Sequence, residues 1–255
     1  MTKQADNAWA RLRLGAWRLV PSGLRGAIER RQHRHQRRAA QVRRTFAYEY
    51  SRLPNRYLAE VESASAHLMD AKERTGLSIG YPAWNLLYYA LLCSLPDVDR
   101  EVIVLETGTN QGFSSIVLAQ ALKDGGAKGI VRTVDVDARA VAAARDHILK
   151  AGLGDTVELN TGDSVEFLHR VVAEHGVVDF AFLDASHQED DVLREFETVL
   201  PAVQACQGKV YFDNTSAGGV AQALQVISQR WGGNLIRFDN CSWSPPGNAI
   251  WQPHC

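Results

Sequence analysis

From residue 102 onward, short apolar runs alternate with longer stretches in which apolar residues recur every three or four positions. The short runs are typical of strands buried on both faces, and the longer stretches of helices with one apolar face. The predicted strands occupy about 102–105, 129–134, 156–159, 177–183 and 208–212. Because a helical stretch follows each of them, we expect right-handed crossovers and an open parallel sheet. Two further strands, 234–239 and 248–251, flank a turn at 244–247 and predict an antiparallel pair that closes the sheet.

Two helices are predicted before the first strand. Apolar residues recur at helical spacing over 54–75, and the stretch 82–93 is apolar almost all round, which indicates a buried helix. The loop between them, 78–81, precedes the first strand closely enough to fold over its carboxyl end. We therefore expect this loop to cover a ligand bound there.

The first fifty residues are strongly basic. They carry twelve Lys and Arg against three acids, a net charge of +9, and the whole chain has a net charge of −1, which leaves −10 on the rest. We expect a basic, helical N-terminal arm over 1–53 and a mildly acidic domain over 54–255. The arm could contact nucleic acid or an anionic membrane. We favour a solvated helix or a homodimer contact, because a run of charge alone specifies no partner.

Composition places the chain among globular proteins. Apolar residues make up 45% of its 255 positions, and its four cysteines show neither a C-x-x-C pair nor a zinc-like spacing with His. A reducing compartment is the simpler expectation. No apolar run approaches the ~18 residues that span a bilayer, and the N-terminus lacks the apolar core of a secretory signal. We expect a cytoplasmic protein without a transmembrane segment.

The stretch after the first predicted strand combines an acid with two glycines. Glu106, Gly108 and Gly112 have the spacing E-x-G-x-x-x-G and lead into a helix that begins near Ser114. Glycine permits positive φ and close approach to a ligand, beside the free N–H groups of a helix N-terminus. We expect Thr109, between the glycines, to bind the same ligand. A carboxylate here suits a cationic ligand and would repel a pyrophosphate, which argues against a nicotinamide-dependent oxidoreductase. The alternative is that the two glycines belong to an ordinary strand–helix turn that binds no ligand.

Polar residues also follow the second and third strands. Asp135 is placed to accept hydrogen bonds from ribose hydroxyls, and Asp137 is placed to cap the next helix. Either aspartate could perform either task, so we expect the pair to divide them. Gly162, Asp163 and Ser164 form the loop after the third strand and could border an adenine ring.

The fourth and fifth strands end in Asp184 and in Asp213-Asn214. Parallel strands joined by one helix place their carboxyl ends on one edge of the sheet, so these residues should lie side by side. Two carboxylates and an amide oxygen suit a hard cation such as Mg²⁺. His187 follows Asp184 by three residues and could accept a proton in the same opening. Helix caps and turns are the alternatives for the acids, and a structural role is the alternative for the histidine.

The ordered motifs VLETGTNQG, TVDVD, DFAFLDASH and VYFDNT resemble those of class I S-adenosylmethionine-dependent methyltransferases, particularly the catechol and caffeoyl-coenzyme A O-methyltransferase group. The resemblance covers about residues 76–252. It implies an α/β fold of the Rossmann-like methyltransferase type, doubly wound, with a mostly parallel seven-stranded sheet and a C-terminal antiparallel hairpin. It also implies that the acid and glycines of the first turn flank the methionine moiety, that Asp135 holds the ribose, and that the loop at 162–164 lies near the adenine.

The resemblance further implies that Asp184, Asp213 and Asn214 bind a divalent metal, with Asp184 close to both the cofactor and the reacting atoms. That family carries a lysine base at the position of His187. A histidine with an ordinary pKa of ~6.5 is largely neutral at pH 7 and can accept a proton directly. Two other departures are Gln207-Gly208, where the family has Gly-Gly, and the basic arm, which has no counterpart.

Together these residues predict an O-methyltransferase that uses S-adenosyl-L-methionine and Mg²⁺, or another divalent cation, on a small hydroxylated acceptor such as a phenol, a sugar or a natural product. One alternative is a metal-independent methyltransferase that acts on nucleic acid through the arm. The fourth strand ends in residues 184–187, DASH, rather than the N-P-P-Y or D-P-P-Y expected for base N-methylation. The other alternative is a non-catalytic protein that binds the cofactor. Five aromatic residues could wall the acceptor or belong to the core: Trp84, Tyr88, Trp231, Trp243 and Trp251.

Overall fold

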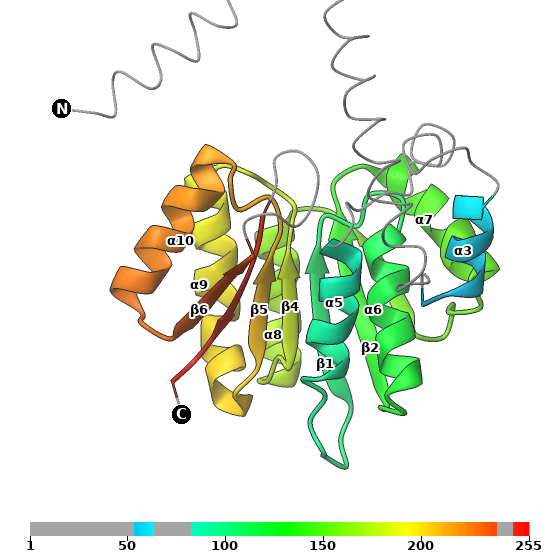
Figure 1. The fold of residues 1–255 in the computed structure, drawn as a ribbon, viewed down its shortest axis with the longest axis horizontal. Helices are drawn as coiled ribbons and strands as arrows, with labels where there is room; N and C mark the ends of the chain where they lie inside the picture. Colours follow the sequence, from blue (N-terminus) through cyan, green and yellow to red (C-terminus); the bar gives the residue numbers. More distant parts are fainter. Residues whose placement is uncertain (1–53, 64–82, 239–246, 255) are drawn as a thin grey trace, which may run out of the picture.

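A mixed sheet of seven strands runs through the computed structural model, which describes residues 54–63, 83–238 and 247–254 (Figure 1). The strands are β1 (Val102–Thr107), β2 (Gly129–Asp135), β3 (Val157–Thr161), β4 (Phe180–Leu183), β5 (Lys209–Phe212), β6 (Asn234–Phe238) and β7 (Asn248–Gln252). Their order is β3-β2-β1-β4-β5-β7-β6, with β1 to β5 parallel and β7 antiparallel to both β5 and β6. The predicted parallel sheet with a C-terminal hairpin is confirmed. The second hairpin strand pairs with β5, which leaves β6 at the edge.

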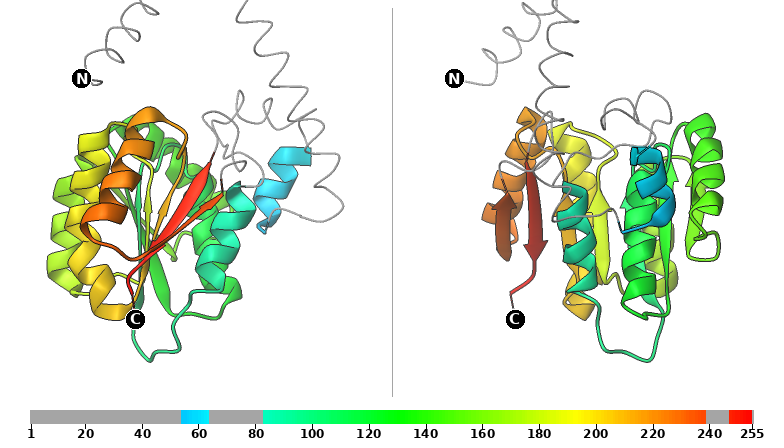
Figure 2. Two further views of the ribbon diagram at one scale, coloured as in Figure 1. Left: turned by 60° about the vertical axis from the view of Figure 1, so that its left-hand side comes forward. Right: turned by 45° about the vertical axis from the view of Figure 1, so that its right-hand side comes forward.

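Helices cover both faces of this sheet, as the turned views in Figure 2 show. They are α3 (Arg56–Ser63), α5 (Ala83–Leu92), α6 (Phe113–Asp124), α7 (Ala138–Lys150), α8 (Ser164–His175), α9 (Glu189–Cys206) and α10 (Gly218–Arg230). One apolar core lies between the sheet and α3, α5, α6 and α7, and a second lies between the sheet and α8, α9 and α10. The fold is therefore doubly wound, with β1 next to the central strand β4.

Strand β1 serves both cores, because its side chains point alternately to the two faces of the sheet. All six of its residues are buried, and its first four alternate between the two cores. The last two residues are polar and continue the alternation. Glu106 accepts a hydrogen bond from Ser115 in α6, whereas Thr107 donates one to Glu195 in α9. The end of β1 thus carries a polar contact to each helix layer.

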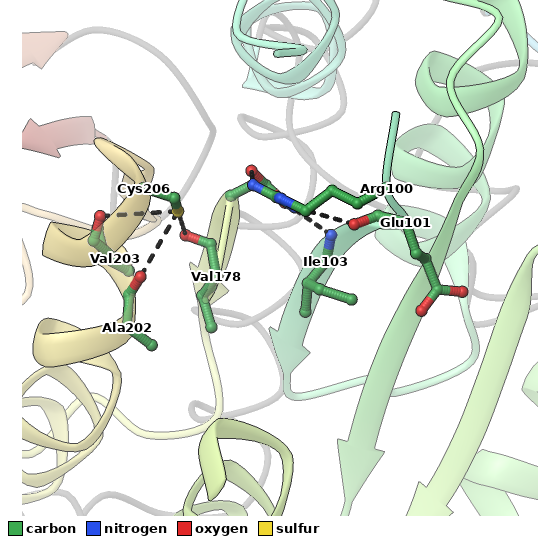
Figure 3. A network of polar contacts seen from close by, with 8 residues as sticks. Arg100, Glu101, Ile103, Val178, Ala202, Val203 and Cys206 are labelled. Atoms are coloured by element: carbon green, nitrogen blue, oxygen red, sulfur yellow. Dashed lines mark hydrogen bonds and ion pairs between the residues drawn. The ribbon is translucent and has the colours of Figure 1, made fainter. Parts of the chain in front are cut away.

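The opposite, amino-terminal end of β1 is locked to β4 by an ion pair. The two terminal guanidinium nitrogens of Arg100 donate to the two carboxylate oxygens of Asp179, each at 2.7 Å. Asp179 also accepts from the backbone N of Ile103 at 2.8 Å. Figure 3 shows this network beside Cys206, whose sulfur lies 3.1 Å from the carbonyl oxygen of Val178. A paired, hydrogen-bonded buried carboxylate fixes the relative position of two strands, and these two meet at the point where the strand order reverses.

The departure from Gly-Gly before β5 has a structural explanation. Gln207 ends α9 with a φ of 58°, in the left-handed region that a non-glycine residue can occupy at a helix end. A Cβ on Gly208 would lie 2.1 Å from the carbonyl oxygen of Val178. Glycine is therefore required at position 208, and position 207 tolerates a side chain.

Several sequence predictions fall outside the described residues. They concern the arm at 1–53, the continuation of the first helix and the covering loop within 64–82, and most of the turn at 239–246. The boundary between the arm and the domain over 54–255 therefore stays a prediction. In the ranges that the structure describes, no helix is both long and apolar enough to cross a membrane.

Candidate active site

A cavity of about 230 Å³ opens at the carboxyl ends of β1 to β4, where the strand order reverses. Its lining includes five of the predicted cofactor residues: Gly108, Asp135, Gly162, Asp163 and Ser164. These come from the loops after three different strands, so the fold brings together groups that are up to 56 positions apart in sequence. Ligands of open α/β sheets bind at such a reversal point, and this cavity is therefore the candidate cofactor site.

The two glycines of the first turn are required by close packing. Gly108 has a φ of 85°, and a Cβ there would lie 2.5 Å from the carbonyl oxygen of Asp184. Gly112 has a φ of 88°, forms the N-cap of α6, and would place a Cβ 3.1 Å from that of Ala144 in α7. The turn after β1 is thus pressed against the backbone at the end of β4. A larger residue at position 108 would push those two strand ends apart.

Glu106 lies beneath this turn and is fully buried. It accepts a hydrogen bond from the Ser115 hydroxyl, while its Oε1 has no hydrogen-bond partner. Burial raises the pKa of the Glu106 carboxyl to about 7. A buried acid with a free oxygen is satisfied by a cationic or hydrogen-donating ligand. Neither Glu106 nor Thr109 is among the residues that line the cavity, and the Thr109 hydroxyl is 2.6 Å from that of Thr133.

Asp135 holds the turn with backbone hydrogen bonds. Its two carboxylate oxygens accept from the backbone N of Asn110 at 2.7 Å and from that of Asp137 at 2.9 Å. Asp137 itself caps α7 by accepting from the backbone N of Arg139 at 2.8 Å. The capping task predicted for one member of this pair therefore belongs to Asp137, and Asp135 remains at the cavity.

Asp163 performs a task that the sequence analysis did not assign to it. Its carboxylate caps α8 by accepting from the backbone N of Glu166 at 3.0 Å. It also lines the cavity, next to Gly162, which has a φ of 149°. The loop after β3 is thus held by a helix cap.

The ends of β4 and β5 bring four predicted residues together, and we call them the carboxylate rim: Asp184, His187, Asp213 and Asn214. Asp184 Oδ1 lies 3.7 Å from His187 Nε2. This contact is the main reason why the pKa of His187 is raised above its ordinary value. The Asp184 side chain is 26% exposed, so it can reach a ligand in the opening.

Asp213 is nearly buried and firmly positioned. Its Oδ1 accepts from the backbone N of Asn214 at 2.8 Å and from Asn248 Nδ2 at 2.6 Å. Burial raises the pKa of Asp213 to about 7, and the nearby charge of Asp184 adds to the effect. Asn214 has a φ of 53°, in the left-handed region. This conformation of a short polar residue turns the chain sharply at the rim.

The donor set of the rim fits a hard cation. Asp184 and Asp213 are carboxyls whose pKa values burial raises, and Asn214 adds an amide. A divalent cation between the carboxylates would offset their mutual repulsion and their cost of burial. Among the described residues, no group of three or more His, Cys, Asp or Glu side chains is arranged to hold a metal ion. The expected site has two such side chains, and its third ligand is an amide.

Comparisons with known proteins agree with this architecture. A family model described as a methyltransferase domain matches residues 105–215. A protein of Mycobacterium bovis (strain BCG / Pasteur 1173P2), assigned as an O-methyltransferase, is 31% identical over 180 residues, which cover 68% of this chain and 75% of that protein. The chain belongs to the S-adenosylmethionine-dependent O-methyltransferase family.

Other relatives cover different shares of this methyltransferase. A catechol O-methyltransferase of Niastella koreensis is 36% identical over 83 residues, which cover 32% of this chain and only 36% of that protein. The crystal structure of an O-methyltransferase from Bacillus cereus in complex with SAH is similar in fold, with a TM-score of 0.63 and 20% identity over 82% of this chain and 96% of that one. The O-methyltransferase TomG from Streptomyces achromogenes has a TM-score of 0.65 and 18% identity over 86% of this chain and 99% of that one.

Sequence reasoning missed Asn248 in this methyltransferase. Asn248 is fully buried at the start of β7, its Nδ2 holds Asp213, and its Oδ1 has no hydrogen-bond partner. The only signal in the sequence is a polar residue that opens an otherwise apolar strand. That signal points to Asp213 only once β7 is known to pair with β5.

Two of the five aromatic residues predicted to wall the acceptor or belong to the core are core residues. Trp84 is 5% exposed and Trp251 is fully buried. Trp231 is half-buried and packs on Phe196 with ring centroids 5.4 Å apart. Tyr88 is also half-buried, and its hydroxyl donates to Asp124 at 2.6 Å. Trp243 lies outside the described residues, and the acceptor stays unspecified.

Proposed function

We propose that this methyltransferase uses a divalent cation, held by the carboxylate rim, to methylate a hydroxyl group of a small molecule such as a phenol, a sugar or a natural product. The observation that carries the proposal is the position of the rim. Asp184 follows β4 and Asp213 follows β5, and the backbone of Asp184 contacts the turn that contains Gly108. A methyl donor in the cavity and a hydroxyl at the rim would therefore be neighbours.

On the cofactor side, the cavity residues bind and orient the donor. The carboxylate of Asp135 accepts hydrogen bonds from the ribose, and the loop of Gly162, Asp163 and Ser164 borders the adenine. Glu106 offers its unpartnered Oε1 beneath the methionine moiety. A buried acid attracts the positive charge of the donor, and this attraction is strong because water is excluded.

On the acceptor side, Asp184, Asp213 and Asn214 are the ligands that would hold the cation. A bound divalent cation supplies Lewis-acid chemistry that lowers the pKa of the acceptor hydroxyl. His187 accepts the hydroxyl proton in its neutral form, and because the contact with Asp184 raises the pKa of the imidazole, this form becomes more populated as pH rises. The partner carboxylate stabilises the imidazolium that results, and the remaining acceleration comes from aligning oxygen, methyl group and sulfur.

The test is methyl transfer from labelled S-adenosylmethionine to a panel of catechols, phenols and sugars. Transfer should stop when EDTA removes the metal, return when Mg²⁺ is added, and fall by about 10³-fold or more in Asp213→Ala, because the lost charge stabilisation is several kcal/mol. Asp190→Ala, which removes an exposed acid from the first turn of α9, is the matched control.

EDTA-insensitive transfer, or wild-type activity of Asp213→Ala, would contradict the role of the metal. Transfer to RNA in place of the small acceptors would favour the alternative that involves the basic arm. Cofactor binding without turnover on the whole panel would favour the non-catalytic alternative.

A further inference from the structure

The mechanism above leaves one buried acid on α9 unused. Glu195 is 2% exposed and lies on the face of α9 that packs against the sheet. Its Oε2 accepts a hydrogen bond from the Thr107 hydroxyl at 2.9 Å, and its Oε1 has no hydrogen-bond partner. Burial raises the pKa of Glu195 to about 7. Burial of an acid without an ion pair lowers the stability of the folded state. An apolar residue of similar size would fill the same space with a smaller loss of stability.

The Thr107 hydroxyl connects this acid to the site. While it donates to Glu195, it accepts from the backbone N of Asp184 at 3.2 Å. A hydroxyl can act as donor and acceptor at once, so the acceptor on one side fixes which lone pair faces the other. With its hydrogen committed to Glu195, the hydroxyl oxygen is left to accept from Asp184. The same backbone N of Asp184 also donates to the Thr107 carbonyl oxygen at 3.2 Å, so the hydroxyl is one of two acceptors that hold it. The bond to Glu195 therefore sets the direction of the side-chain half of this contact.

Thr107 is continuous in sequence with the donor side of the site. It is preceded by Glu106 and followed by Gly108, whose turn packs on the carbonyl oxygen of Asp184. A shift of the β1 end relative to the β4 end would move the donor turn and the rim apart. Methyl transfer needs its three reacting atoms in line, and a displacement of ~1 Å can cost about 10²-fold in rate.

We propose that Glu195 is a positioning residue, which acts through the Thr107 hydroxyl to fix the distance between the donor turn at Gly108 and the rim residue Asp184. It touches neither substrate nor cofactor. The inference rests on the proposed function, because it gives Asp184 a place at the reacting atoms. It predicts a defect in the chemical step, and leaves cofactor affinity nearly intact.

The experiment is a double-mutant cycle on the full chain. Thr107→Val removes the hydroxyl at constant shape, and Glu195→Leu removes the acceptor while filling its space. Each should lower kcat by about 10- to 100-fold, whereas the dissociation constant of S-adenosylhomocysteine should change by less than about 3-fold. Because both act through one bond, the double variant should be no slower than the slower single variant.

Rescue and a control separate positioning from general destabilisation. Glu195→Gln keeps an oxygen acceptor for Thr107 and should retain kcat within about 3-fold of wild type. Glu197→Gln, an exposed neighbour on α9 that pairs with Arg230, should leave every value unchanged. Urea unfolding confirms that each variant is folded, and should Glu195→Leu fail to fold, Glu195→Met replaces it in the cycle, because Met also lacks an acceptor for the hydroxyl and has a similar size.

Three results would overturn the inference: wild-type kcat in both Thr107→Val and Glu195→Leu, multiplicative losses in the double variant, or a loss confined to cofactor affinity. A Glu195→Gln variant as slow as Thr107→Val would also overturn it. The two proposals fail separately, since EDTA-insensitive transfer by the wild type contradicts the metal, whereas multiplicative losses contradict the role of Glu195.

Discussion

Around the cavity, the acids after β2 and β3 are tied to backbone N–H groups, whereas at the carboxylate rim the acids after β4 and β5 lie near one another. Asp135 accepts backbone hydrogen bonds from Asp137 and from Asn110 in the turn after β1, and Asp163 accepts one from Glu166 in the first turn of α8. The charge of Asp184 instead raises the pKa of Asp213, and Asp213 is held by the Asn248 side chain from another strand. The cavity is thus shaped by hydrogen bonds to the backbone. The rim depends on side chains from distant parts of the chain and gains most from a positively charged ligand.

The largest expected effect that separates the two parts is on the proton acceptor of the rim. His187→Ala should lower kcat by about 10²- to 10⁴-fold, the usual contribution of a general base. The dissociation constant of S-adenosylhomocysteine should stay at its wild-type value, because His187 does not line the cavity. Stopped-time transfer assays measure kcat, and calorimetry measures the dissociation constant of S-adenosylhomocysteine. His169→Ala, on the exposed face of α8, is the control. An unchanged kcat would remove His187 from the mechanism.

A second, smaller effect concerns the free energy of unfolding of the ligand-free protein. Glu106 has a pKa of about 7 in the folded state against an ordinary value of 4.5, so the folded state retains a proton that the unfolded state releases. The stability from this group is complete below about pH 4.5 and is lost as pH rises through about 7, a loss of the order of 3 kcal/mol.

Glu106→Gln should therefore reduce the fall in stability between about pH 5 and pH 8, measured by urea unfolding, while Glu195 and Asp213, whose pKa values are also raised to about 7, keep the rest of it. Glu174→Gln, an exposed acid in the last turn of α8, should keep the wild-type pH dependence. An equal pH dependence of the free energy of unfolding in wild type and in Glu106→Gln would show that the Glu106 carboxyl is not held neutral in the folded state. The contrast between the cavity and the rim would then be weaker.

The smallest effect separates the two aspartates after β2. Asp135→Asn should weaken S-adenosylhomocysteine binding by about 10-fold, because a charge-assisted hydrogen bond contributes about 1.5–3 kcal/mol. Asp137→Ala should cost about 1 kcal/mol of stability as a lost helix cap and leave cofactor affinity unchanged. Calorimetry and urea unfolding check the pair. Reversed effects would assign the ribose to Asp137.

The cavity was the more predictable of the two parts. Gly108, Gly112 and the division between Asp135 and Asp137 follow from local rules, since positive φ and helix capping depend on a few neighbouring residues. The capping of α8 by Asp163 was not predicted, because an acid in a loop at the start of a helix can cap the helix and face a ligand at the same time. Thr109 was expected to bind the ligand, and its bond to Thr133 could not be read from either strand alone. The roles of the ligand-contacting residues stay predictions.

The sequence by itself determined the alternation of strands and helices, the glycine turn after β1 and the set of polar residues at the strand ends. These follow from periodicity and backbone conformation, which act over a few positions. Only the tertiary structure decided that β7 enters between β5 and β6, which brings Asn248 to Asp213, and that Glu195 reaches Thr107 across 88 positions. Such contacts depend on which strands pair and which helix face is buried, and those choices minimise the free energy of the whole chain. The glycine turn after β1 is thus a local motif, but its distance from the rim is a property of the fold.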